Sequence, residues 1–332
     1  MIDILRLSKE EQQIIFRNAA MQMGVHEAII EKDYWVCLVL DYLFNKCEYR
    51  DQLIFKGGTS LSKCFGLVRR FSEDIDLILD WRTLGYDKNE PWIERSKTKQ
   101  DIFNKEANER AKIFLANDFI EILRKDLGEI IGTEVILEID ENDLQTIAFH
   151  YPQLFEDDSI LQVIRLEIGA LAAWTPSVKK EVMPYIMEFY PQASPTLSTT
   201  VVTTSALRTF WEKVTILHHE ANRPEHLEMP SRYSRHYYDL ASFANSEYKS
   251  KALDNIDLLH KVVKFKMKFY PRGWAKYEEA VVGTIKLLPD KSRWDNLKRD
   301  YMSMEEMLFG EYPSFESLMS LIKELEDEIN EQ

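Results

Sequence analysis

The chain has 332 residues, and its content of 45% hydrophobic and 12% aromatic residues excludes a disordered protein. Its 56 Asp and Glu residues outnumber its 42 Lys and Arg residues, and the net charge of -14 excludes a protein that coats nucleic acid over its whole surface. The three cysteines have no CxxC spacing, and no apolar stretch reaches the roughly 18 residues of a membrane span. These features predict a cytoplasmic protein without disulfides, a zinc site or a membrane span.

The first half of the chain predicts helices, followed by a strand, a helix and a second strand. Apolar residues recur three and four positions apart between 8 and 46, which predicts a pair of helices, the first with a capping box of Ser8 and Glu11. The stretch "DQLIFKGG" predicts a strand that ends at the glycines. The further elements are a helix over 60–68, a strand over 74–81, a helix over 99–128 and strands over 134–140, 146–152 and 161–174.

The second half of the chain predicts a helical domain. The pattern changes after "PQASPTLSTT", a segment rich in Pro, Ser and Thr. We therefore expect an α+β protein with a domain boundary near 195–203, in which residues 1–200 form a mixed sheet flanked by helices and residues 201–332 are helical. The expected helices of the second domain cover 205–221, 235–245, 254–270, 273–283 and 314–330.

The stretch "KGGTSLSKCFGLVRRFSEDIDLIL" contains the residues best suited to catalysis. It is not a phosphate-binding P-loop, because that pattern needs a glycine where Ser62 stands and a hydroxyl residue where Cys64 stands. Side chains alternate along a strand, so Asp74 and Asp76 share one face while their apolar neighbours point to the core. Two carboxylates one pleat apart repel each other when desolvated, and they suit a hard cation such as Mg²⁺ or Mn²⁺.

The same stretch resembles the polymerase-β-like nucleotidyltransferases, which combine a glycine turn, a helix and two acids one residue apart. In that superfamily a third carboxylate comes from a neighbouring strand. Glu167 in "VIRLEIG", which shares its face with Arg165, is the first candidate, and Glu138 in "VILEID" is the second. The alternative is a tight turn followed by a charged strand end, which is the usual explanation when a glycine pair or a DxD stands alone.

Over nearly its whole length the chain resembles the AbiEii/AbiGii family of toxin nucleotidyltransferases, including the MenT-like toxins. The resemblance rests on "KGGTSL", "RRFSEDIDL", "IIEKDYWVCLVL", "FWEKVTILH", "SRHYYDLASF" and the C-terminal "DYMSMEEMLFGEYPSFESLMSLIKELEDEIN". It implies catalytic Asp74, Asp76, Lys213 and Asp239, metal-binding Asp74, Asp76 and Glu167, and nucleotide-binding Gly57, Gly58, Thr59, Ser60, Arg70 and Ser72. One departure is His236 in "RHYYDL", which stands where these toxins often have an acid.

The implied residues outside the DxD strand also have ordinary explanations. Lys213 lies at the margin of the apolar stripe of its helix, and it either reaches a triphosphate or forms a structural ion pair with Asp239. Asp239 follows Arg235 by four positions, so a salt bridge along the helix is its plain alternative. Arg70 either clamps a phosphate or pairs with Glu73. The family resemblance favours catalysis for Lys213 and Asp239 and leaves Arg70 open.

Residues 260–276, "HKVVKFKMKFYPRGWAK", contain six Lys and Arg residues and no acid, in a chain that is otherwise acidic. The aromatic residues among them, such as Tyr270 and Trp274, make this segment the candidate surface for RNA. The alternative is a helix whose aromatic residues lie in the core and whose lysines form one solvated face.

Two other clusters are not assigned to a site. We expect Glu31, Lys32 and Asp33 of "EKDYW" to be structural, because adjacent side chains on a helix point in different directions. The neighbouring His218 and His219 do not have a metal-binding spacing.

Together with the resemblance, these residues imply a Mg²⁺-dependent enzyme that transfers a nucleoside monophosphate from an NTP to a hydroxyl. The implied acceptor is the 3′ end of a tRNA, and the implied partner is an antitoxin. One alternative is transfer to a protein hydroxyl. A second alternative is a catalytically silent module that binds a nucleotide or a partner.

Overall fold

Two compact units make up the chain in its computed structural model. The first comprises Met1–Cys64 and Ser72–Thr203, and the second comprises Phe65–Phe71 and Thr204–Gln332. The structure describes residues 4–72, 74–157, 160–173, 175–191 and 198–332. Within these ranges no helix is both long enough and apolar enough to cross a membrane.

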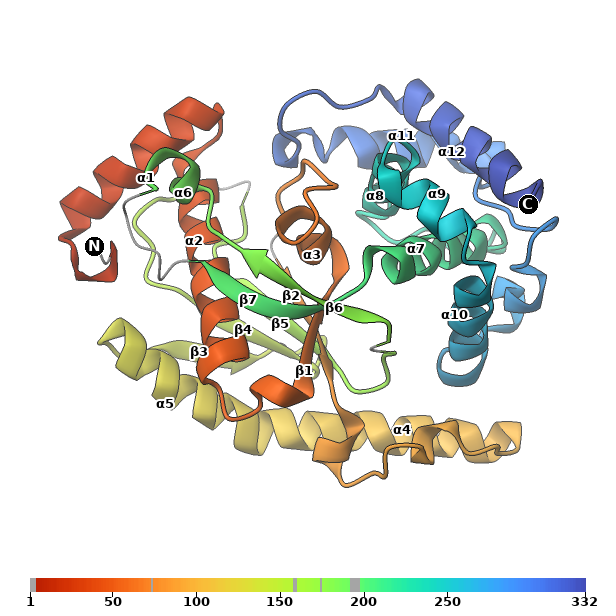
Figure 1. Cartoon of the computed structure of the whole chain (residues 1–332), viewed down its shortest axis with the longest axis horizontal. Helices are drawn as coiled ribbons and strands as arrows, with labels where there is room; N and C mark the ends of the chain where they lie inside the picture. The colour runs from red at the N-terminus through yellow and green to blue at the C-terminus, as the bar shows by residue number, and fades with distance from the viewer. Residues whose placement is uncertain (1–3, 73, 158–159, 174, 192–197) are drawn as a thin grey trace. The chain divides into compact units, whose positions relative to one another are not determined.

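A seven-stranded mixed sheet forms the core of the first unit (Figure 1). Its strands are β1 (Leu53–Lys56), β2 (Asp74–Leu79), β3 (Ile136–Ile139), β4 (Thr146–His150), β5 (Ile164–Gly169), β6 (Ser177–Val182) and β7 (Thr199–Thr204). They lie in the order β3-β4-β5-β2-β1-β7-β6. β2 is antiparallel to β1 and parallel to β5, and β7 is parallel to β1. The sheet and its helices confirm the predicted α+β class.

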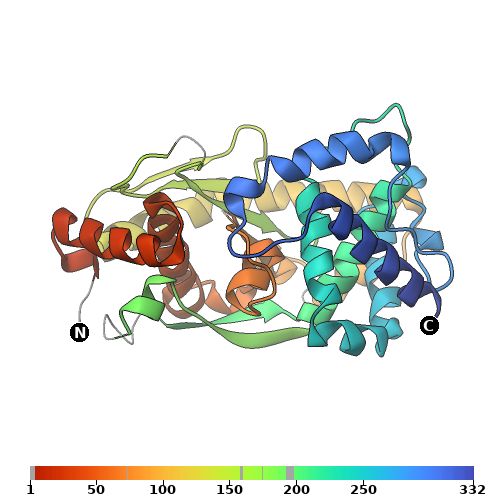
Figure 2. The same ribbon diagram turned by 90° about the horizontal axis from the view of Figure 1, so that it is seen from above.

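Helices pack around this sheet (Figures 1 and 2). They are α1 (Lys9–Met23), α2 (Glu27–Asp41), α3 (Gly57–Lys63), α4 (Lys97–Phe114), α5 (Ile120–Ile131) and α6 (Ile186–Phe189). The predicted capping box is present at the start of α1, where the side chains of Ser8 and Glu11 accept hydrogen bonds from each other's backbone N–H groups. α3 contacts β1 and β2, and α1 contacts α2. The predicted helix over 99–128 is formed by α4 and α5, which the π-helical turn Leu115–Phe119 joins.

The charged residues of "EKDYW" in α2 hold three different segments in place, as a structural role predicts. Glu31 is fully buried and accepts hydrogen bonds of 2.7 and 3.2 Å from two consecutive backbone N–H groups. This burial raises the pKa of Glu31 to about 7. Lys32 donates to a backbone carbonyl, and Asp33 forms a buried ion pair with Lys63 of α3.

The second unit is helical. Its helices are α7 (Ala206–Ala221), α8 (Ser234–Ala244), α9 (Glu247–Leu253), α10 (Ile256–Phe269), α11 (Trp294–Met302) and α12 (Phe315–Asn330). α7 packs against α8, α9 and α10, and α12 packs against α8. The segment Phe65–Phe71 belongs to this unit through backbone hydrogen bonds, of which one runs from Phe71 N–H to the carbonyl of Met307 at 2.7 Å. The chain therefore passes through the helical unit between α3 and β2.

Several elements differ from the sequence prediction. Strands β6 and β7 lie where no strand is predicted. β6 is mostly exposed and rich in charged residues, and β7 is a mostly buried run of Thr and Val whose sequence lacks a clear apolar alternation. The predicted helix over 273–283 is wrong, because Lys276 has a left-handed φ of 48° and separates two short 3-10 turns. Helices α9 and α11 lie where no helix is predicted. Residues 192–197, in the predicted boundary segment, lie outside the described residues.

Candidate active site

Asp74 and Asp76 lie on one face of β2, as the alternation of side chains predicts. Both are half-buried, whereas Ile75 and Leu77 are fully buried. The side chain of Asp74 is 18% exposed, so its carboxylate can reach solvent from an otherwise apolar sheet. Two accessible carboxylates in this arrangement supply the oxygen ligands that a hard divalent cation needs.

Glu167 lies directly beside Asp76 across the parallel strands β2 and β5. The register pairs Asp74 with Arg165 and Asp76 with Glu167, so all four side chains share one face. Neighbouring strands lie about 4.8 Å apart. Glu138 is on β3, which β4 and β5 separate from β2, so it lies three strand spacings, or roughly 14 Å, from the aspartates. The register therefore favours Glu167 over Glu138 as the third carboxylate.

The glycine pair starts α3 directly after β1, earlier than the predicted helix begins. Gly57 has a φ of +83°, and a Cβ at this position would lie 1.8 Å from Oδ2 of Asp76. Only glycine allows both this backbone conformation and the close approach of the carboxylate. The hydroxyl of Thr59 donates to the carbonyl of Asp74, and that of Ser60 donates to the carbonyl of Gly57 at 2.9 Å. These bonds hold the glycine turn against the start of β2.

Arg165, which the sequence analysis did not assign to the site, lies among the carboxylates. Its Nε atom is 3.9 Å from Oδ1 of Asp74 and 3.8 Å from Oε1 of Glu167. Its Nη1 atom forms an ion pair with Asp140, which follows β3. In the sequence, Arg165 and Glu167 alternate with apolar residues and therefore share one face of the strand. This pattern was the signal that would have identified Arg165.

The carboxylate face has the right chemistry for a divalent cation but does not form a closed set of ligands. Among the residues that the structure describes, no three His, Cys, Asp or Glu side chains are grouped closely enough to hold a metal ion. Asp74 and Glu167 lie beside Arg165, and the carboxylate of Asp76 lies close to Gly57. The three carboxylates fit a hard cation by type and by register, and they would converge on it through side-chain rotation.

In the second unit, Arg70, Lys213 and Asp239 form a buried ion-pair cluster. Arg70 binds Asp239 through two hydrogen bonds, from Nε to Oδ1 at 2.7 Å and from Nη2 to Oδ2 at 3.0 Å. Lys213 Nζ donates to Oδ2 of the same carboxylate at 2.7 Å. The three side chains are at most 8% exposed. The ion pair between Lys213 and Asp239, one of the ordinary explanations, is thus present, and Arg70 is part of it.

This cluster carries a net charge of +1, because the two cations of Arg70 and Lys213 share one carboxylate. Burial by itself would raise the pKa of Asp239, but the charges of Arg70 and Lys213 hold that pKa below its usual value. Burial lowers the pKa of Lys213 and lowers that of His236 further. His236 is therefore neutral, with Nδ1 2.9 Å from Lys213 Nζ, and does not cancel the positive charge. A buried excess of positive charge favours the binding of an anion such as phosphate.

The predicted site residues thus fall into two groups by unit. The first unit contains Gly57, Gly58, Thr59, Ser60, Ser72, Asp74, Asp76 and Glu167, and the second contains Arg70, Lys213 and Asp239. Ser72 is half-buried and lies in the irregular segment before β2. Asp239 is bound by Arg70 and Lys213, which are 169 and 26 positions away, rather than by its helix neighbour Arg235. Glu73, the other partner considered for Arg70, lies outside the described residues.

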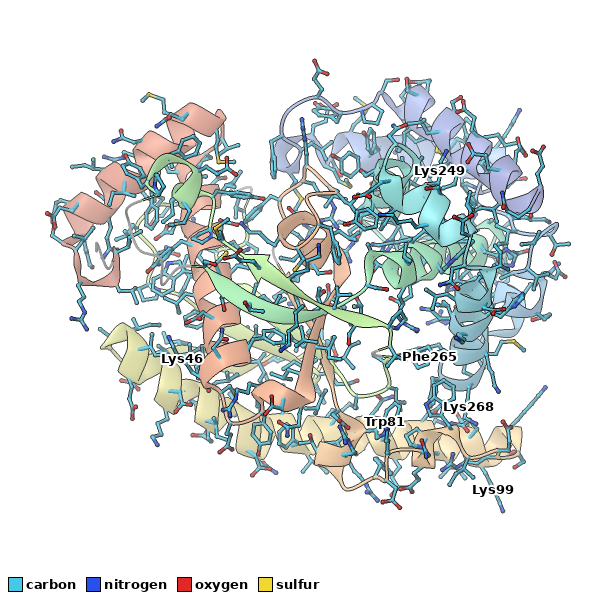
Figure 3. All side chains as sticks on the ribbon, viewed as in Figure 1. Lys46, Trp81, Lys99, Lys249, Phe265 and Lys268 are labelled. Atoms are coloured by element: carbon cyan, nitrogen blue, oxygen red, sulfur yellow. The ribbon has the colours of Figure 1, made fainter. Side chains whose placement is uncertain are left out.

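The basic segment over 260–276 forms most of α10 and the turns after it. Phe265 and Phe269 are each 4% exposed, whereas Lys264 is exposed and Lys268 is half-buried. Figure 3 labels Phe265 and Lys268 on this helix. The aromatic residues of the helix thus lie in the core and the lysines lie toward solvent, which is the ordinary amphipathic arrangement. Tyr270, just after the helix, is 45% exposed and offers a ring for stacking.

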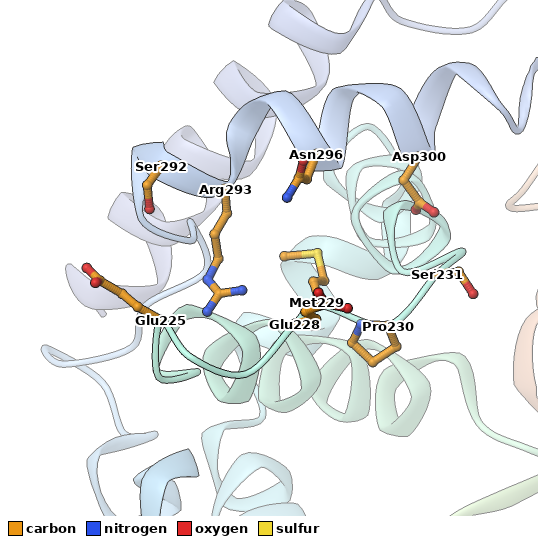
Figure 4. A pocket seen from close by; sticks show the side chains of 9 residues that line it. All are labelled: Glu225, Glu228, Met229, Pro230, Ser231, Ser292, Arg293, Asn296 and Asp300. Carbon is orange, nitrogen blue, oxygen red and sulfur yellow. The ribbon is translucent and has the colours of Figure 1, made fainter.

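A cavity of about 580 Å³ in the second unit is lined by residues of two segments, 225–231 and 292–300 (Figure 4). Asp300, which lines it, accepts a hydrogen bond of 2.8 Å from the backbone N–H of Ser234, and Arg293 donates to a backbone carbonyl at 2.6 Å. Its full lining is Glu225, Glu228, Met229, Pro230, Ser231, Ser292, Arg293, Asn296 and Asp300. None of the predicted site residues is among them, so this cavity is not part of the candidate active site.

Comparison with known proteins identifies a family. The family model described as "Nucleotidyl transferase AbiEii toxin, Type IV TA system" matches residues 39–321. Among solved structures, the nucleotidyltransferase toxin MenT4 from Mycobacterium tuberculosis is similar at 17% identity and a TM-score of 0.43, over 97% of this chain and 98% of that one. JHP933 from Helicobacter pylori is similar at 14% identity and a TM-score of 0.44, over 92% of this chain and 94% of that one. No curated protein gives a significant match.

Proposed function

This chain belongs to the AbiEii family of nucleotidyltransferase toxins, and on that premise we propose that it transfers a nucleoside monophosphate from an NTP to an acceptor hydroxyl. The acceptor oxygen attacks the α-phosphorus, the bond from that phosphorus to the bridging oxygen breaks, and pyrophosphate leaves. The observation that supports this proposal most is the register of β2 and β5, which sets Glu167 beside Asp76 with Asp74 one pleat away.

Asp74, Asp76 and Glu167 are the residues that would hold Mg²⁺ or Mn²⁺. A divalent cation bound there would neutralise phosphate charge and lower the pKa of the acceptor hydroxyl. The chain itself contributes positioning. Gly57 has no side chain and so leaves room for the carboxylate of Asp76, and the hydroxyl of Thr59 holds the glycine turn through its hydrogen bond to the carbonyl of Asp74.

We assign the phosphate contacts of the glycine turn to its backbone. The hydroxyls of Thr59 and Ser60 already donate to backbone carbonyls, so the backbone N–H groups around Gly58 and Thr59 are better suited than these hydroxyls to donate hydrogen bonds to phosphate oxygens. Ser72 remains the proposed hydroxyl contact of the nucleotide.

The second group of residues has a proposed electrostatic role. By family resemblance, Lys213 offsets the negative charge of the departing pyrophosphate, and Asp239 holds Lys213 in place. The net positive charge of the cluster with Arg70 supports this assignment, because a buried excess of positive charge favours an anionic ligand. Arg70 is proposed to contact the nucleotide or to hold Asp239 in place.

We propose RNA as the acceptor, with the 3′ end of a tRNA as the most suitable form. Lys261 and Lys264 are exposed on α10, and the exposed ring of Tyr270 follows them. Lys266 Nζ lies 5.5 Å from the centroid of the Tyr270 ring, and cations together with a stackable ring suit a single-stranded nucleic-acid end. We also propose a cognate antitoxin as partner and the cytoplasm as the place of action, since the family description names a toxin-antitoxin system.

The proposal is tested by incubating the full-length protein with each NTP labelled at the α-phosphate, Mg²⁺, and either total tRNA or total protein. We expect label in tRNA, and no label with the Asp74→Asn and Asp76→Asn double variant. Label in protein alone would establish a protein acceptor instead. NTP binding without labelling of either fraction would indicate the silent module and contradict the proposal.

Charge reversal on α10 tests the acceptor surface. Lys261→Glu with Lys264→Glu is expected to weaken tRNA labelling about tenfold and to flatten its dependence on salt. The matched control is Lys97→Glu with Lys99→Glu, two exposed lysines of α4, which should leave labelling near the wild-type level. Equal effects of the two pairs would mean that α10 is not the RNA surface.

A further inference from the structure

Arg165 occupies the middle of the carboxylate face that is proposed to bind a divalent cation. It faces Asp74 in the register of β2 and β5, and its side chain is 27% exposed. The Nε atom lies nearly midway between Asp74 and Glu167, at 3.9 and 3.8 Å from their nearest oxygens. These distances are too long for tight hydrogen bonds but short enough for strong attraction between the charges.

The other end of the same guanidinium is held more firmly. Nη1 of Arg165 donates to Oδ2 of Asp140. The carboxylate of Asp140 in turn accepts hydrogen bonds from the backbone N–H groups of Asn142 at 2.8 Å and Asp143 at 3.3 Å. These bonds, together with Arg165, lower the pKa of Asp140. Asp140 is thus a fixed anionic anchor beside the face, and Arg165 spans the distance from this anchor to the two carboxylates.

A guanidinium in this position competes with a divalent cation. The carboxylates of Asp74 and Glu167 would repel each other without a positive charge between them, and Arg165 supplies that charge. A bound Mg²⁺ needs the same oxygens and is repelled by the guanidinium. The cation therefore binds more tightly when the guanidinium of Arg165 is held away from these oxygens, and Asp140 is placed to do this.

We propose that Arg165 is a positioning residue that serves as the resident counter-ion of the carboxylate face, and that Asp140 keeps the guanidinium of Arg165 away from the carboxylates when a divalent cation binds. The inference rests on the proposed function, because it takes Asp74, Asp76 and Glu167 as the cation site. Its consequence is that Arg165 and Asp140 set the affinity of the site for the cation in opposite directions.

Mn²⁺ binding to the full-length protein, followed by electron paramagnetic resonance of the free ion, tests this directly. Arg165→Gln removes the competing charge and should tighten Mn²⁺ binding about five- to tenfold. Asp140→Asn removes the anchor and should weaken it about threefold. Arg165→Lys keeps the charge and should bind Mn²⁺ close to the wild-type affinity. The control Lys105→Gln, which removes an exposed ion pair with Asp101 on α4, should have no effect.

The opposite signs separate this role from a structural one. If Arg165 only supported the fold, Arg165→Gln and Asp140→Asn would both weaken Mn²⁺ binding, and that result would overturn the inference. The melting temperature without metal shows which variants are folded, and Mn²⁺ should raise it more in Arg165→Gln than in the wild type.

The same titration distinguishes this inference from the proposed function. If the wild type binds Mn²⁺ and Asp76→Asn abolishes binding, the cation site stands, and an unchanged affinity in Arg165→Gln then contradicts the role of Arg165 alone. If the wild type does not bind Mn²⁺ at millimolar concentration, both the cation site and the inference fail.

Discussion

Glu167 stands opposite Asp76 in the register of two parallel strands, although the two residues are 91 positions apart in the sequence. The pairing sets a third carboxylate on the face that carries the DxD aspartates. It also provides an internal comparison, because Glu138 is a carboxylate of the same sheet that lies three strands from β2.

The first prediction uses this comparison. Glu167→Gln should lower kcat for nucleotide transfer by at least 100-fold, because it removes one of the oxygens proposed to hold the cation. Glu138→Gln should leave kcat within about twofold, because Glu138 is exposed and its ion-pair partner is His150 on the neighbouring strand β4, at 3.4 Å. Steady-state kinetics of both variants decide the assignment, and a larger loss in Glu138→Gln would reverse it.

The second prediction concerns the glycine turn. Gly57→Ala should abolish activity and destabilise the protein by roughly 2–4 kcal/mol, because the left-handed φ is strained and the new methyl group would meet the carboxylate of Asp76. Gly132→Ala is the matched control, since Gly132 has a φ of +81° but nothing within 4 Å of its Cβ position. It should cost only the backbone strain, about 1–2 kcal/mol, with activity retained. Urea unfolding and kinetics measure both effects.

The third prediction separates structure from catalysis in the buried cluster. Lys213→Met should remain folded within about 1 kcal/mol of the wild type, because Arg70 still neutralises Asp239 with two hydrogen bonds. Its activity should nevertheless fall by at least 100-fold. Asp239→Asn should cost roughly 3–5 kcal/mol, since it leaves two buried cations without an anion. Lys213 would be only structural if Lys213→Met unfolded the protein or left kcat unchanged.

The fourth prediction concerns pH. Burial, and then the charges of Arg272 and Arg223, lower the pKa of His219 to about 4. Its folded pKa is thus below its unfolded value of about 6.5, so its contribution to stability is full above pH 6.5 and is lost as the pH falls toward 4. His219→Phe, which keeps a ring beside Trp274, removes this dependence. The variant should therefore gain stability relative to the wild type between pH 8 and pH 5.

Urea unfolding of wild type and His219→Phe at both pH values measures this difference. Glu31, whose raised pKa acts with the opposite sign, is present in both proteins and cancels from the comparison. A difference in stability that is the same at pH 8 and pH 5 would contradict the prediction.

Local patterns in the sequence predicted much of this site. The alternation of charged and apolar residues predicted that Asp74 and Asp76 share one strand face. The three- and four-residue spacing of apolar residues predicted helices α7 and α8, which contain Lys213 and Asp239. These features depend on neighbours within a few positions, so a single chain is enough to find them. The resemblance to a family then joined them into one functional hypothesis.

The remaining features depend on pairings between distant segments. Strand order decides between Glu167 and Glu138, and nothing local in either strand gives that order. The partner of Arg70 lies 169 positions away, and the ion pair of Arg165 with Asp140 requires knowledge of how β3, β4 and β5 are arranged. Such contacts arise from tertiary packing, which periodicity does not encode.

The most direct test of the account is release of pyrophosphate from an NTP, measured with tRNA present in the wild type and in Asp76→Asn. We predict release that requires both tRNA and Mg²⁺, that stops with EDTA, and that falls by at least 1000-fold in Asp76→Asn. Pyrophosphate release that continues in Asp76→Asn, or that proceeds equally in EDTA, would contradict the assignment of the carboxylate face as the site of nucleotidyl transfer.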